Sequence, residues 1–212
     1  MPGTLLPHET LDELTEVAHE IVREVMSAPD EAFGFGFDFK HERVGPAAYN
    51  VEHSIDTTVI GLLVGRRLVP GDALDDLGVG LFLQDIGKLA LPPRLVFKEG
   101  PLAADEWELM MRHPLLGLEF LRNDAIPARA KAVVRSHHER WDGSGYPGGL
   151  VGHEISEFAR IAAVADVFDA LTSERYHAPA VTRHQGLATI LAGSGTAFDP
   201  KVVETFLVVA GV

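Results

Sequence analysis

Apolar residues recur at intervals of three and four along most of this chain, and this spacing constrains its fold more than any other feature. In residues 9–26 they fall at Leu11, Leu14, Val17, Ala18, Ile21, Val22 and Val25, as expected for a helix with one buried face. Comparable patterns predict helices over 47–69, 72–89, 105–113, 114–122, 127–140, 156–173, 182–191 and 200–209. We therefore expect an all-α protein.

The chain has 212 residues, a length that suits one main domain with a sizeable core. We expect residues 47–212 to form that domain and residues 1–46 to form an N-terminal helix followed by a Phe/Gly-rich segment. The alternation Phe33-Gly34-Phe35-Gly36-Phe37 fits either a short strand or an aromatic-rich loop.

Charge and cysteine content exclude several classes of function. The formal net charge of −13 argues against a protein that coats a nucleic acid polymer, because that mode needs a broad basic face. Cysteine is absent, so any metal must be bound by histidines and carboxylates. No signal peptide and no apolar stretch long enough to span a membrane is apparent, so we expect a cytoplasmic protein.

Two aspartates fall on the apolar faces of predicted helices. Asp85 follows Leu81 by four residues, and Asp166 follows Ala162 by four. A buried carboxylate is costly unless it is paired, hydrogen-bonded or bound to a metal. For Asp85 the simpler explanation is a local ion pair with Lys88, three residues on.

Histidines on the predicted helices suggest that these aspartates share a pocket. His53, His113 and the adjacent His137 and His138 belong to separate predicted helices. A single helical histidine is more often a surface or hydrogen-bonded residue than a ligand. Several on consecutive helices are what convergence on one metal pocket requires.

A Gly-rich turn follows the histidine pair. His137-His138-Glu139 precedes Asp142 and Gly143-Ser144-Gly145-Tyr146-Pro147. The run suggests imidazoles at the floor of a pocket and an aromatic residue at its mouth. The alternative is a polar helix end followed by an ordinary turn.

In order and spacing, these motifs resemble the HD-GYP family of the HD phosphohydrolases. The resemblance rests on His53, Gln84-Asp85-Ile86-Gly87-Lys88, His113-Pro114, His137-His138-Glu139, Gly145-Tyr146-Pro147 and Asp166. It covers roughly Ala47 to the C-terminus. The resemblance implies an HD-domain helical bundle around divalent metals, commonly iron or manganese, and hydrolysis of the bacterial messenger cyclic di-GMP to pGpG or GMP.

The resemblance also implies roles for individual residues. One metal would be held by Asp85, His113, His137 and His138, and a second by His53, the residue before Asp85, and Asp166, with Asp85 as the bridge. Asp85 and Lys88 would serve catalysis. Lys88, Tyr146 and Arg175 would contact the substrate.

The chain departs from the family at the first residue of the His-Asp pair, where it has Gln84. A neutral amide oxygen replaces imidazole poorly on a transition metal, so we expect the second metal position to be weakened and one or two ions to bind. The family's basic residues after Arg175 are also missing. Two hypotheses stay open: a phosphodiesterase with reduced activity, or a module that binds a cyclic dinucleotide or a signalling protein without turnover. A phosphohydrolase acting on another nucleotide is a third, weaker reading.

Overall fold

The computed structural model describes residues 7–28, 46–122, 125–174 and 179–212. The described residues form helices and no strand, which confirms the all-α prediction. The α-helices are α1 (His8–Ser27), α2 (Pro46–Leu68), α3 (Leu74–Leu83), α4 (Pro93–Val96), α5 (Ala104–Met110), α6 (His113–Phe120), α7 (Ala128–Ser136), α8 (Glu157–Thr172), α9 (Arg183–Ala192) and α10 (Pro200–Val209). Short 3-10 helices lie at Gly71–Ala73 (η2), Ile86–Ala90 (η3) and Gly152–Glu154 (η4).

Several helices begin where a polar side chain caps the first turn. Ser156 accepts a hydrogen bond from the Ala159 N–H at the start of α8, and Asp199 accepts one from Lys201 at the start of α10. Thr182 and Gln185 form a reciprocal capping box on α9. Such caps satisfy backbone donors that the helix itself leaves unpaired.

The core lies between α2, α3 and α8. Fully buried residues of α2 and α8, such as Ile60, Leu62 and Ile161, pack with Phe206 of α10. A separate described cluster joins Leu11 and other residues of α1 to α3, η3 and α7. Each large apolar side chain buried in this way contributes about 1.5–3 kcal/mol to stability.

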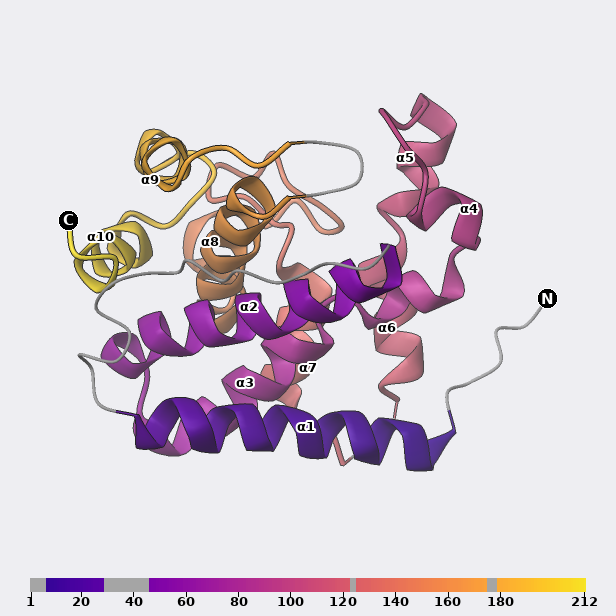
Figure 1. Cartoon of the computed structure of the whole chain (residues 1–212), viewed down its shortest axis with the longest axis horizontal. Helices are drawn as coiled ribbons and strands as arrows, with labels where there is room; N and C mark the ends of the chain where they lie inside the picture. Colours follow the sequence, from indigo (N-terminus) through magenta and orange to yellow (C-terminus); the bar gives the residue numbers. More distant parts are fainter. Residues whose placement is uncertain (1–6, 29–45, 123–124, 175–178) are drawn as a thin grey trace.

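The helices are arranged so that α1 runs along one side of the molecule next to α2 and α3 (Figure 1). α9 and α10 lie at one end, and α4 and α5 lie at the other (Figure 1). Within the described ranges, no helix combines the length and apolarity needed to cross a bilayer. The boundary at residue 46 stays a prediction, and the Phe/Gly-rich segment falls outside the described residues.

Three predicted helices end at other places than expected. The helix predicted over 72–89 breaks after Leu83, and Asp85 lies between α3 and η3. The helix predicted over 127–140 ends at Ser136, so both histidines of the pair follow it. His113 begins α6 instead of ending the preceding helix, because Pro114 fits the first turn, where its missing N–H costs nothing.

Candidate metal centre

The residues of the candidate centre are brought together by a close approach between η3 and α6. A Cβ atom added to Gly87 would lie 1.9 Å from the His113 carbonyl oxygen, so only glycine fits there. The approach sets Asp85, at the start of η3, beside His113, at the start of α6. His137 and His138 reach the same point from the end of α7.

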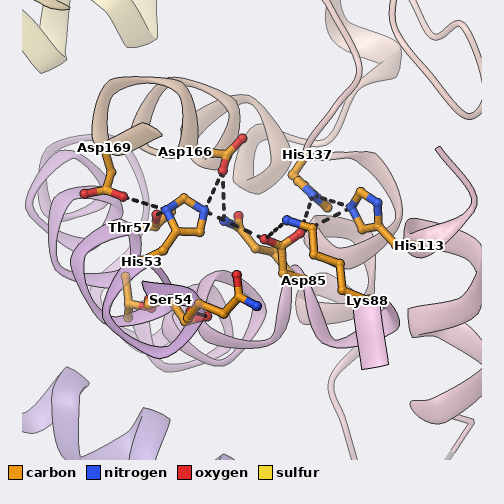
Figure 2. A network of polar contacts seen from close by, with 12 residues as sticks. His53, Ser54, Thr57, Asp85, Lys88, His113, His137, Asp166 and Asp169 are labelled. Atoms are coloured by element: carbon orange, nitrogen blue, oxygen red, sulfur yellow. Dashed lines mark hydrogen bonds and ion pairs between the residues drawn. The ribbon is translucent and has the colours of Figure 1, made fainter. Parts of the chain in front are cut away.

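Asp85, His113, His137 and His138 each offer a ligand atom, and the four atoms lie within 4.8 Å of one another. The His113 Nε2 atom is 3.2 Å from the His137 Nε2 atom. The Asp85 Oδ1 atom lies 3.3 Å from the first of these nitrogens and 3.7 Å from the second. Figure 2 shows His113 and His137 facing Asp85 from one side.

Backbone contacts determine which ring nitrogen of each histidine carries the proton. The His113 Nδ1 atom lies 2.8 Å from the Met110 carbonyl oxygen, and the His137 Nδ1 atom lies 3.2 Å from the Val133 carbonyl oxygen. A carbonyl can only accept, so both Nδ1–H groups donate. In the neutral rings, both Nε2 lone pairs therefore point at each other and at Asp85.

A cation fits this arrangement of acceptors. Within the described residues, the buried Asp85 Oδ1 atom has no hydrogen-bond donor. Burial lowers the pKa of His113 to about 4, which keeps the ring neutral. Burial also lowers the pKa of His138. Neutral imidazoles and a carboxylate are ligands for a divalent metal, so the centre supports divalent metal binding.

Lys88 keeps Asp85 ionised. Burial alone would raise the pKa of Asp85, but the Lys88 ammonium beside it outweighs burial and holds that pKa well below its usual range. The Lys88 Nζ atom lies 2.5 Å from the Asp85 Oδ2 atom. The local ion pair considered for these residues is therefore present, alongside the convergence of histidines.

A second polar group adjoins the first. The ring of His53, on α2, lies between two aspartates of α8: its Nδ1 atom is 2.6 Å from Asp169 and its Nε2 atom is 3.0 Å from Asp166 (Figure 2). Burial would lower the pKa of His53, but hydrogen bonds to these carboxylates outweigh it and raise the pKa to about 9. The same histidine holds the pKa of Asp166 below its usual range, against the effect of burial.

Asp85 connects the two groups. Its Oδ1 atom faces His113 and His137, whereas its Oδ2 atom lies 3.7 Å from the His53 Nε2 atom. The structure thus brings the six predicted ligand residues together, in the two sets that the resemblance implied. Their individual roles as ligands stay predictions.

Gln84 lies in the second group and is fully buried. Its Nε2 atom is 3.4 Å from the Asp166 Oδ1 atom. Its Oε1 atom has no hydrogen-bond partner among the described residues. The amide therefore lies against the group formed by His53 and Asp166.

The Gly-Tyr-Pro turn is held by a residue to which the sequence analysis gave no role. The buried carboxylate of Glu139 accepts hydrogen bonds from the Gly148 N–H at 2.6 Å and the Leu150 N–H at 3.0 Å. A Cβ atom on Gly145 would lie 2.3 Å from the Arg140 nitrogen, so the turn closes tightly on the chain after α7. Tyr146 is thereby placed near the histidine pair.

Asp169 was also missed by the sequence analysis. It follows Asp166 by three residues, so the two share a face of α8. That spacing was a usable signal for a pair of carboxylates around one histidine. Ser173 donates to the other oxygen of Asp169 at 2.6 Å and holds this carboxylate in place.

A cavity of about 270 Å³ opens above the candidate metal centre. Of the predicted substrate residues, Lys88 and Tyr146 line it, and Arg175 lies outside the described residues. The Tyr146 ring stacks on His138, with ring centres 4.8 Å apart. The predicted substrate contacts and the candidate ligands thus border one space.

The chain is similar to several known proteins. The family model described as HD domain matches residues 54–202. The response regulator RpfG of Xanthomonas campestris pv. campestris, named a cyclic di-GMP phosphodiesterase, is 48% identical over 128 residues, which cover 59% of this chain and 34% of RpfG. A cyclic di-GMP phosphodiesterase of Vibrio cholerae is 41% identical over 134 residues, 60% of this chain and 27% of that protein.

Among solved structures, a cyclic GMP-AMP-specific phosphodiesterase of V. cholerae aligns with a TM-score of 0.61 and 26% identity, over 76% of this chain and 44% of that chain. The chain spans about a third or less of the length of RpfG and of the cyclic di-GMP phosphodiesterase of V. cholerae.

Proposed function

The chain belongs to the HD domain family, and from this premise we propose that it is a metal-dependent phosphodiesterase that hydrolyses cyclic di-GMP to pGpG or GMP. The relatives confirm the resemblance to the HD-GYP branch. The observation that carries the proposal is the convergence of Asp85, His113, His137 and His138 beneath a cavity bordered by Lys88 and Tyr146.

The metal proposed is iron or manganese. Imidazole and carboxylate ligands without a thiolate suit these ions. Asp85, His113, His137 and His138 would hold one ion, and His53 and Asp166 would contribute to a weaker second position beside Gln84. A bound divalent metal supplies positive charge that polarises the phosphodiester and neutralises charge developing on it.

The chain's own residues would orient the substrate. The Lys88 ammonium pairs with Asp85 and borders the cavity. In the complex it would donate a hydrogen bond to a phosphate oxygen of the substrate. Tyr146 would line the base or ribose, with its ring held by His138. Asp169 would keep His53 oriented through its Nδ1 atom.

The comparisons do not favour the alternative of a module that binds without turnover, because the relatives are named phosphodiesterases. A phosphate contact from Arg175, a cytoplasmic location and a signalling-protein partner stay predictions from the sequence. Cyclic di-GMP is proposed over other cyclic dinucleotides because RpfG, at 48% identity, is named a cyclic di-GMP phosphodiesterase, whereas a relative named as specific for 3′3′-cGAMP is 42% identical.

The test is turnover by the purified protein loaded with Fe(II) or Mn(II). Cyclic di-GMP and 3′3′-cGAMP are supplied in parallel, and products are separated by chromatography. We expect pGpG or GMP from cyclic di-GMP, and no product from an Asp85→Ala variant. A wild-type rate no higher than that of this variant would overturn the proposal. Faster turnover of 3′3′-cGAMP would keep the phosphodiesterase and replace its substrate.

A further inference from the structure

We propose that Trp107, on α5, is a stacking platform for one purine base of the substrate. The inference rests on the proposed function, because the base belongs to the cyclic dinucleotide whose phosphodiester would lie at the metal centre. Trp107 is 47% exposed, although it is among the most apolar and bulky side chains of the chain. It lines the same cavity as Lys88, His138 and Asp166.

Core packing does not explain the position of Trp107. None of the seven residues of α5 is buried. The helix is held instead by polar contacts on Glu106, whose carboxylate accepts a hydrogen bond from the Ala103 N–H at 2.8 Å and pairs with Lys98. These contacts fix the first turn of α5 and hold the neighbouring Trp107 at the cavity.

The lining of the cavity includes both kinds of side chain that a nucleotide would contact. The polar ones include His53, His113, His138 and Asp166. The apolar ones include Leu95, Val96, Leu102, Trp107 and Met110. A nucleotide joins a charged phosphate to a flat, weakly polar base. With the phosphate at the metal centre, the base would pack against the apolar side chains.

Trp107 is also held in a defined relation to the metal ligands. Its ring meets the Tyr146 ring edge-on, with centres 6.2 Å apart and planes at 80°. Tyr146 in turn stacks on His138. Because one face of Tyr146 is covered by His138, the indole offers the larger aromatic surface for a base at this cavity. Purine bases stack on such surfaces without regard to sequence.

The test uses the fluorescence of Trp107 and steady-state kinetics on the metal-loaded protein. The chain has two tryptophans, and Trp141 packs away from this cavity against Arg160 and His153. A Trp141→Phe variant leaves Trp107 as the reporter and also serves as the matched control. The probe is a hydrolysis-resistant phosphorothioate analogue of cyclic di-GMP.

We expect saturable quenching in Trp141→Phe. Trp107→Ala no longer carries the reporter, so its affinity for the probe is measured as competitive inhibition of turnover, and we expect this affinity to be on the order of 10-fold weaker than in the wild type. Its KM for cyclic di-GMP should rise while kcat and metal content stay within about twofold. Trp107→Phe should recover part of the affinity. Wild-type affinity in Trp107→Ala, or equal loss of metal and kcat, would overturn the stacking role and leave the proposed function standing. Failure of the wild type itself to bind or cleave cyclic di-GMP would overturn both.

Discussion

Replacing Gln84 with histidine should raise the number of tightly bound divalent metals from one to two per chain. The Gln84 side chain is fully buried, and its Oε1 atom has no hydrogen-bond partner in the described part of the chain. Its Nε2 atom reaches Asp166 at 3.4 Å. An imidazole in this position would join His53, Asp166 and the Oδ2 atom of Asp85, which already face one another.

The magnitude follows from what the substitution removes and adds. The hydrogen bond from Gln84 to Asp166 is long, so its loss costs no more than about 1 kcal/mol. Loss of a residue that only supports a metal ligand typically costs about 10- to 100-fold in metal affinity. Adding a direct ligand should therefore tighten binding of the second ion by at least that factor, or about 1.4–2.7 kcal/mol.

The assay is metal content per chain by mass spectrometry after loading with Mn(II) and desalting. We expect one ion in the wild type and two in Gln84→His. Gln84→Leu is the matched control, because it removes the amide without supplying a ligand and should stay at one ion. Two ions already in the wild type, or one ion in a correctly folded Gln84→His protein, would refute the reasoning.

Three further predictions concern the framework of the site. Gly87→Ala should destabilise the protein by about 1–3 kcal/mol and lower its metal content, because its Cβ would meet the His113 carbonyl. Gly71→Ala is the control, because its Cβ has no neighbour within 4 Å among the described residues, and it should change metal content little. Equal losses of stability in urea and of metal in the two variants would contradict this. Glu139→Ala should cost about 2–4 kcal/mol in urea unfolding, since two backbone N–H groups lose a charged acceptor, and a loss below about 1 kcal/mol would count against it. The pKa of His113 falls from 6.5 to about 4 on folding, so the metal-free protein should lose stability as the pH drops through this range. In thermal melts at these pH values, His113→Asn should lose less stability than the wild type. Equal losses in the two proteins would contradict this.

Helical periodicity in the sequence predicted the all-α fold because the longer helices, such as α1 and α10, bury their periodic apolar residues. It predicted α1 and α10 almost to the residue, since each carries its periodic apolar residues along nearly its whole length. It failed at the ends of α3 and α7. Asp85 and His137 continue the periodic pattern, but their backbones leave the helix because the segments that follow are held by contacts with distant parts of the chain.

Two residues show what a linear pattern leaves out. Glu139 is charged and close to two histidines, so the sequence does not reveal that its carboxylate is buried and bound to the turn nine to eleven residues later. Trp107 precedes Met110 and Met111 by three and four residues, a helical spacing that would suit a core position, yet it is half exposed. Burial is a property of what packs on a residue, and only the folded chain supplies it.

The sequence by itself determined the kind of protein: helices with inward histidines and aspartates, no cysteine, and motifs in the order of the HD-GYP family. Tertiary structure decided how those residues work together. It set the protons of His113 and His137 on Nδ1 through local carbonyls, turned both Nε2 atoms toward Asp85, and placed His53 between two aspartates of α8. The reason is that these arrangements depend on distances between segments far apart in the chain, such as the 116 positions between His53 and Asp169, and spacing along the chain does not encode those distances.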